Sequence, residues 1–168
     1  VGVVFIIGMT RVRGVSLRTQ LPMMHFWRTV VGTISLTTWF FAIAVLPLAT
    51  AMTLNYMSSV WIAAFLLGGA LLTQGRNAPM KNQAPLFMAV LAGFAGVAMM
   101  LRPTLQPEQV LGAVVGLFSG IFAALAYLQV AALSRAGEPE SRTVFYFSVG
   151  AVVAGLAGML FAGASPWH

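Results

Sequence analysis

The chain has 168 residues, of which 60% are hydrophobic and 7% are charged. A soluble domain carries about 25% charged residues, so this chain has too little charge to cover a surface that faces water. Its net charge of +6 lies in short segments between apolar runs, which favours a role in membrane orientation over nucleic-acid binding. The absence of cysteine excludes disulfides and thiolate metal sites.

Long uncharged runs separate short polar segments along the whole chain. Residues 1–9 are interpreted as the end of a partial span, and a polar loop follows at 10–24. The next run, 29–72, has 44 residues without a charged side chain, about twice the length that a helix needs to cross a bilayer. Pro47 divides it into predicted spans at 26–46 and 48–72. Three more spans are predicted, at 85–101, 110–133 and 143–164.

These runs predict an all-α polytopic membrane helix bundle with five complete spans and one partial span. None of the runs alternates with period two, which excludes a membrane β-barrel. The prolines support the boundaries, because proline disrupts a helix interior. All eight are expected in loops or at span ends: Pro22, Pro47, Pro79, Pro85, Pro103, Pro107, Pro139 and Pro166.

Basic residues are distributed unevenly between the two sides of this bundle. Loops 10–24, 73–84 and 134–142 contain seven Lys or Arg residues, and the opposite side contains only Arg102. Cytoplasmic loops of membrane proteins are enriched in Lys and Arg. We therefore expect the three loops in the cytoplasm. Arg28, at the entry of its span, is expected to extend toward the cytoplasmic headgroups.

Small residues recur at four-residue spacing in the span at 110–133, at Gly112, Gly116 and Gly120. Such a stripe allows helix backbones to approach closely in lipid. Two interpretations stay open, a static packing contact and a sliding contact between two halves of a transporter. The spans at 143–164 and 85–101 have comparable positions: Ala151, Gly155, Gly158 and Ala162, and Gly93 and Gly96.

The sequence shows no catalytic constellation. Its three carboxylates, Glu108, Glu138 and Glu140, fall in predicted loops, and its two histidines, His25 and His168, fall at span ends. No helix is expected to carry a buried His/Glu pair or a metal-ligand cluster, and no carboxylate is expected within the membrane. The prediction is therefore a protein that is not an enzyme and that has no cofactor and no metal.

Uncharged polar and aromatic side chains lie inside the predicted spans. Asn55 and Ser59 share one helix face, Tyr56 and Trp61 flank them, and Trp39 and Tyr127 lie on other spans. Lipid cannot satisfy the amide of Asn55, so it either bonds to another helix or lines a cavity. The candidate substrate-binding residues are Trp39, Asn55, Tyr56, Ser59 and Tyr127.

Several segments of the chain form a recognisable pattern. They are Phe-Trp-Arg-Thr-Val-Val-Gly at 26–32, the Trp-Phe-Phe-Ala…Leu-Pro-Leu-Ala-Thr-Ala hairpin at 39–51, Leu-Asn-Tyr at 54–56, Gly-Phe-Ala-Gly-Val at 93–97 and Leu-Arg-Pro at 101–103. With these segments the chain resembles the EamA-type repeat of the drug/metabolite transporter superfamily. Members are similar in having ten helices in two inverted five-helix repeats. The resemblance implies that 1–103 is a first repeat without its first helix, and that 104–168 begins the second. Gln74 stands where many relatives carry a glutamate.

This resemblance implies a multi-pass inner-membrane transporter that works by alternating access. The solute would be a small organic metabolite, an amino-acid, drug or nucleoside-like compound, bound near the midplane between the repeats. The expected partners are the lipid bilayer and this solute, with no nucleic acid and no prediction of oligomeric state. The alternative is a membrane scaffold or assembly subunit that transports nothing and uses its polar residues only to join helices.

Overall fold

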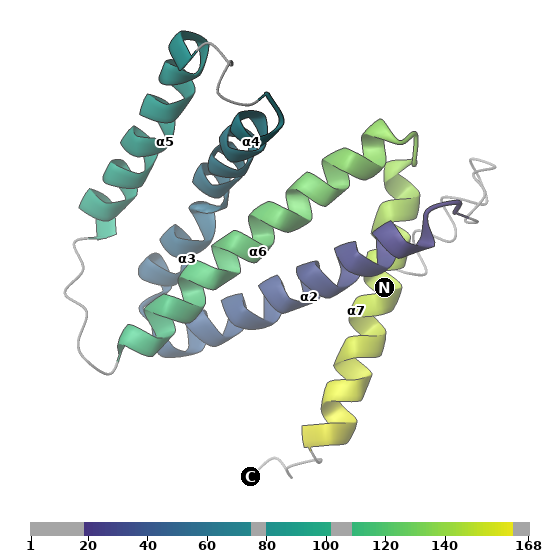
Figure 1. Cartoon of the computed structure of the whole chain (residues 1–168). Helices are drawn as coiled ribbons and strands as arrows, with labels where there is room; N and C mark the ends of the chain where they lie inside the picture. The colour runs from purple at the N-terminus through teal and green to yellow at the C-terminus, as the bar shows by residue number, and fades with distance from the viewer. Residues whose placement is uncertain (1–18, 75–79, 102–108, 163–168) are drawn as a thin grey trace. The chain divides into compact units, whose positions relative to one another are not determined.

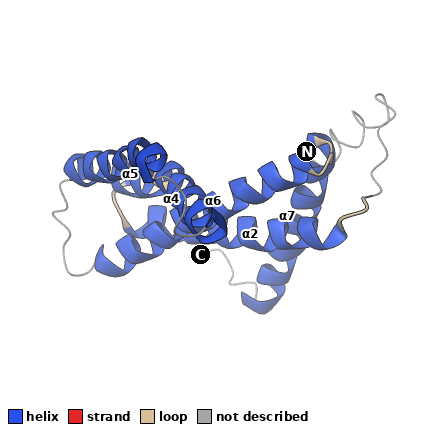
Figure 2. Cartoon of the chain, turned by 45° about the horizontal axis from the view of Figure 1, so that its top comes forward, coloured by secondary structure: helices blue, strands red, loops and turns tan. Residues whose placement is uncertain are grey.

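The computed structural model describes residues 19–74, 80–101 and 109–162, and all regular structure in these ranges is helical (Figures 1 and 2). The elements are α2 (Pro22–Val45), α3 (Leu48–Tyr56), α4 (Ser58–Gln74), α5 (Met80–Leu101), α6 (Val110–Arg135) and α7 (Glu140–Ala162). The predicted all-α class is confirmed. The partial span at 1–9, the loop arginines Arg11, Arg13, Arg18, Arg76 and Arg102, the side chain of Gln74, and His168 lie outside what the structure describes.

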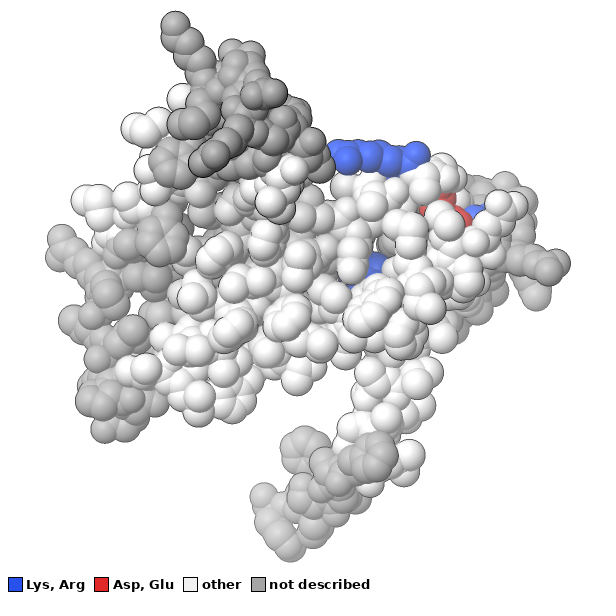
Figure 3. Space-filling model, in the orientation of Figure 1, with Lys and Arg blue, Asp and Glu red and all other residues white. Residues whose placement is uncertain are grey.

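Within the described ranges, four helical stretches are long and apolar enough to cross a membrane: Pro22–Val45, Leu48–Ala70, Val110–Arg135 and Glu140–Leu160. They correspond to the predicted spans at 26–46, 48–72, 110–133 and 143–164. The predicted span at 85–101 is helical too, because it lies within the 22-residue α5. Figure 3 shows that most of the visible surface of the described residues carries no charge, as expected for a surface that faces lipid.

Prolines define two helix boundaries, and one proline contradicts the prediction. Pro22 is the first residue of α2, where a missing N–H costs nothing. Pro47 lies between α2 and α3 with an extended conformation, φ −53° and ψ 135°. The expectation for Pro85 was wrong, because α5 begins at Met80 and contains it. Since Pro85 comes just after the first turn, it removes only one helical hydrogen bond.

The predicted span at 48–72 is interrupted at Met57, between α3 and α4. Met57 keeps right-handed helical angles, φ −61° and ψ −10°. Its N–H donates to the Thr53 carbonyl at 3.2 Å, and its own carbonyl accepts from the Trp61 N–H at 3.0 Å. The interruption is therefore a local distortion within one span, and not a turn between two.

The described residues form two compact units. Unit 1 contains residues 19–33 and 128–162, and unit 2 contains residues 34–74, 80–101 and 109–127. The core of unit 2 consists of Ala42, Leu46, Ala51, Leu54 and Met57, from α2 to the α3–α4 junction. Ile43, Trp61, Ala113 and Leu117 pack against this core, and α5 packs against α3 and α4. The predicted repeat boundary at residue 103 stays a prediction.

In unit 2, α6 approaches its neighbours at its three glycines. A methyl group added at Gly120 would lie 2.7 Å from the backbone carbonyl oxygen of Leu54. One added at Gly116 would lie 2.8 Å from the Leu54 Cδ1 atom, and one at Gly112 would lie 3.1 Å from the Leu46 Cγ atom. The hydroxyl of Ser35 adds a bond across to α6, donating to the Ser119 carbonyl at 3.0 Å. Only glycine permits this backbone separation at position 120.

Candidate functional site

The five predicted binding residues all lie in unit 2, but the structure does not gather them around one described cavity. Trp39 and Asn55 are half-buried, whereas Ser59 is exposed. Tyr56 is 66% exposed and Tyr127 is 58% exposed. The hydroxyl of Ser59 donates to the Tyr56 carbonyl at 3.0 Å, within its own helix turn. Their role in substrate binding therefore stays a prediction.

Two buried donors of unit 2 lack partners among the described residues. The indole Nε1 atoms of Trp39 and Trp61 are buried and have no acceptor there. The amide of Asn55 makes no hydrogen bond to another described side chain or backbone group. A buried indole N–H usually finds an acceptor, so the described chain leaves these two indole donors unsatisfied.

A buried ionic cluster in unit 1 centres on Glu138, which is 8% exposed. Its Oε1 atom accepts a hydrogen bond of 2.6 Å from the Thr19 hydroxyl. Its Oε2 atom accepts one of 2.6 Å from Arg142 Nη1, and His25 Nε2 lies 3.6 Å from the same oxygen. His25 is itself only 2% exposed. The carboxylate therefore joins the residues around the start of α2 to the start of α7.

Local backbone geometry places Glu138 in this cluster. Gly137 has φ +82°, a conformation that glycine adopts without strain. Its N–H donates to the Ser134 carbonyl at 3.1 Å, and the N–H of Glu138 donates to the Leu133 carbonyl at 3.1 Å. This pair of bonds is the Schellman motif that ends a helix. The next residue, Pro139, accepts the first bonds of α7, so Glu138 is held between two fixed helix ends.

The surroundings of Glu138 favour its ionised form. Burial alone raises the pKa of this carboxyl, but the hydrogen bonds from Thr19 and Arg142 and the charges of Arg142 and His25 outweigh it. The pKa of Glu138 therefore lies below its ordinary value of 4.5. The cluster is intact at neutral pH, and acid weakens it.

The sequence did not reveal this cluster, which joins a span-end histidine to a loop carboxylate. Thr19 and Glu138 are 119 positions apart, and no periodicity or motif links positions so distant. Taken singly, each residue of the cluster was assigned to a loop or to the end of a span. Glu138 does lie outside the helices, between α6 and α7. Only the packing of α2 against α7 makes the pairing. Glu140, also assigned to a loop, is the first residue of α7.

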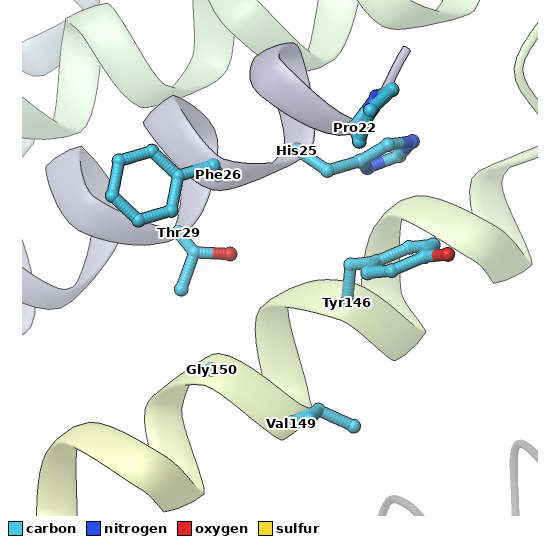
Figure 4. A pocket seen from close by; sticks show the side chains of 7 residues that line it. All are labelled: Pro22, His25, Phe26, Thr29, Tyr146, Val149 and Gly150. Carbon is cyan, nitrogen blue, oxygen red and sulfur yellow. The ribbon is translucent and has the colours of Figure 1, made fainter. Parts of the chain in front are cut away.

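A pocket of about 220 Å³ lies beside the cluster, lined by Pro22, His25, Phe26, Thr29, Tyr146, Val149 and Gly150 (Figure 4). Its polar wall is the imidazole of His25, which stacks on the Tyr146 ring with centroids 4.7 Å apart. The Nδ1 atom of His25 has no hydrogen-bond partner among the described residues. The pocket is otherwise mainly apolar and suits a small apolar group better than a charged one.

Arg28 differs from its predicted orientation. Its guanidinium lies 4.4 Å from the centroid of the Phe147 ring, and a methyl group added at Gly32 would contact its Nη1 atom. Gly32 is one turn further into α2, so the side chain runs along the helix away from the helix start. A cation–π contact of this kind stabilises a charge that leaves water.

No protein-family model matches the chain, and no solved structure matches it significantly. It is similar to the pseudopaline exporter CntI of two Pseudomonas aeruginosa strains, UCBPP-PA14 and PAO1, with 34% identity over 147 residues in each case. This match covers 88% of the chain and 49% of the exporter.

A second similarity is to an uncharacterized transporter of Helicobacter pylori J99, 27% identical over 133 residues, which are 79% of the chain and 42% of that protein. The chain thus spans about half the length of the curated relatives it matches. Together with the four candidate spans, these similarities identify the chain as a multi-pass membrane protein related to proteins named as transporters.

Proposed function

We propose that the chain is part of an EamA-type transporter of the drug/metabolite superfamily that exports a small organic metabolite across a bacterial inner membrane. The observation that carries this proposal is the 34% identity to an exporter over 147 of the 168 residues. The matched length includes most of a chain with four candidate spans, so the similarity extends over the membrane-embedded part. Transport of this kind includes no catalytic step.

The architecture proposed for the whole protein is the inverted repeat of that superfamily. Residues 1–103 belong to the first repeat and residues 104–168 to the second, with the solute bound near the midplane and released by alternating access. Half of the relatives' length lies outside this chain. Residues from that half therefore complete the binding site in this scheme.

The orientation proposed places loops 10–24, 73–84 and 134–142 in the cytoplasm. The bond between Thr19 and Glu138 supports one element of it, because residues from two of these loops meet. Labelling of introduced cysteines with a thiol reagent that cannot cross the membrane tests on which side these loops lie. A cysteine at Ala136 should resist labelling in intact cells, and one at Gln106 should react.

The polar groups of unit 2 distinguish a transporter from a scaffold. A scaffold uses a buried amide as a structural hydrogen bond between helices, and Asn55 makes no such bond within the described chain. A transporter needs the amide for an incoming solute. The lack of a structural hydrogen bond from the Asn55 amide within the described chain therefore favours a transporter over a scaffold.

The test uses the full-length protein in liposomes and a panel of radiolabelled amino acids, nucleosides and drug-like amines. Asn55→Ala should reduce flux at least severalfold while the melting temperature stays close to that of the parent. Thr53→Ala is the matched control on the same helix, because the Thr53 hydroxyl already donates to the Ala49 carbonyl at 2.7 Å. Absence of flux for every solute would refute the transporter, and unchanged flux in Asn55→Ala would refute the role of this residue.

A further inference from the structure

The Glu138 cluster joins two segments that belong to different repeats of the proposed architecture. Thr19 and His25 precede the repeat boundary proposed at residue 103. Glu138 and Arg142 follow it. The threonine hydroxyl and the arginine Nη1 atom each donate a hydrogen bond of 2.6 Å to the carboxylate, and the histidine Nε2 atom lies 3.6 Å from it. In alternating access, contacts between the repeats on one side of the membrane break when that side opens, and this cluster is such a contact.

Beside the cluster, one face of α2 lies against one face of α7. The ring of His25 stacks on the ring of Tyr146. One turn further along each helix, a methyl carbon added at Gly150 would lie 3.2 Å from the Cβ atom of Thr29, and Figure 4 shows the Thr29 side chain directed toward Gly150. Residues four positions apart share a helix face. The two helices are therefore in contact from the cluster inward for about one turn.

The chemistry of the cluster suits a contact that opens and closes. Neither Thr19 nor Glu138 lies in a helix, so no helical hydrogen bond has to break when they separate. A buried ion cluster gains little net free energy over its separated and hydrated groups, because the attraction is offset by lost hydration. In the proposed orientation both segments adjoin the cytoplasm, whose water hydrates the groups once they part. The closed contact therefore holds without being prohibitively costly to open.

We propose that the Glu138 cluster is a cytoplasmic latch of the transporter. The latch holds α2 against α7 while the cytoplasmic side is closed, and it separates when that side opens to admit the solute. This inference rests on the proposed function and names the contact that regulates access to its binding site. Glu138 accordingly sets the balance between the closed and open cytoplasmic side and does not bind the solute.

The first experiment locks α2 to α7 next to the latch. Thr29→Cys together with Gly150→Cys places two Cβ atoms 3.2 Å apart, close to the separation of about 3.5–4.5 Å across a disulfide, and leaves the latch residues in place. The full-length protein, free of other cysteines, is assayed in liposomes with radiolabelled amino acids, nucleosides and drug-like amines. Oxidation should abolish flux and reduction should restore it. Each single-cysteine variant is the control, and oxidation should leave its flux unchanged.

The second experiment releases the latch and measures opening without any need for flux. A single cysteine at Thr29 is labelled with an impermeant thiol reagent in inside-out membrane vesicles, which expose the cytoplasmic side. Glu138→Gln should raise the labelling rate roughly tenfold, as expected when a charge-assisted hydrogen bond no longer favours the closed side. Glu140→Gln is the matched control, because Glu140 is exposed two positions away and should leave the rate unchanged. A cooperative melting transition shows that each variant folds.

The outcomes separate the latch from the proposed function. Flux that continues in the cross-linked protein overturns the latch and leaves the transporter intact. Labelling at the parent rate in folded Glu138→Gln does the same. A cysteine pair that stays reduced under oxidation contradicts the contact between α2 and α7 on which the latch depends. Absence of flux for every solute before any cysteine is introduced overturns the proposed function together with this inference.

Discussion

The two units hold their helices together by different means. In unit 2, small residues let backbones approach, and the closest contact is between Gly120 of α6 and the Leu54 carbonyl. In unit 1, a buried carboxylate with two short hydrogen bonds joins the start of α2 to α7. Apolar burial does not drive helix association in lipid, so each unit needs a specific contact. The contact at Gly120 depends on side-chain volume, and the cluster at Glu138 depends on charge. The first should therefore respond to an added methyl group, and the second to loss of the carboxylate charge.

The largest effect is expected from Gly120→Ala, because the added methyl group would lie 2.7 Å from a backbone oxygen. Backbone cannot rotate away as a side chain can, so α6 must shift. A loss of about 3 kcal/mol in unfolding free energy is expected, at the upper end for overpacking. Thermal denaturation of the full-length protein in detergent measures it. Gly155→Ala on α7 is the control, since an added methyl group there meets no described atom. Equal melting temperatures for the two variants would contradict the close backbone contact.

Removing the charge of Glu138 should have the next largest effect. Glu138→Gln leaves the Arg142 guanidinium without its carboxylate, and the expected loss is about 2 kcal/mol, as for a broken charge-assisted hydrogen bond. Glu140→Gln changes an exposed carboxylate two positions away and should be close to neutral. A double-mutant cycle with Arg142→Gln sharpens the test. If the two losses simply add, the pair seen in the structure contributes no coupling.

Acid should weaken unit 1 selectively. The pKa of Glu138 in the folded chain is below 4.5, so its stabilising contribution is complete above that value. The contribution is lost as the pH falls through the folded pKa, because the unfolded state then binds the proton more readily. The difference in melting temperature between the parent and Glu138→Gln should therefore be constant from pH 7 to about 5 and shrink toward pH 3. A difference that stays the same down to pH 3 would mean that the charge of Glu138 does not stabilise the fold.

The smallest effects are expected at the other glycines of α6. An alanine methyl group at Gly116 meets the Leu54 Cδ1 atom, and one at Gly112 meets side-chain atoms of Leu46 and Val45. These atoms end flexible side chains, so losses of about 0.5–1 kcal/mol are expected. Melting temperatures should rank Gly120→Ala lowest, then Gly116→Ala, then Gly112→Ala. A reversed order would show that side-chain contacts, and not the backbone approach at Gly120, limit the packing.

Helical periodicity alone did not distinguish the glycines of α6 from those of α7. Both helices have small residues at similar spacing, but Gly112, Gly116 and Gly120 face α2 and α3, whereas Gly155 and Gly158 face open space in the described chain. A stripe of small residues shows that a helix is able to pack closely. It does not name the partner, because the partner belongs to another part of the chain.

The sequence by itself determined the helical class, the order of the elements and most boundaries, because lipid admits only spans whose backbone bonds are satisfied internally. It misplaced Pro85, since one lost hydrogen bond near a helix start is tolerated in a long apolar helix. The tertiary structure alone decided the side-chain partners. Glu138 was a loop carboxylate until the packing of α2 against α7 placed His25 and Thr19 beside it. Trp61 was a flanking aromatic until the structure placed its ring beside Gly120 of α6 and its N–H in a buried position without an acceptor among the described residues. Spans follow from local hydrophobicity, whereas such pairings depend on which distant segments meet.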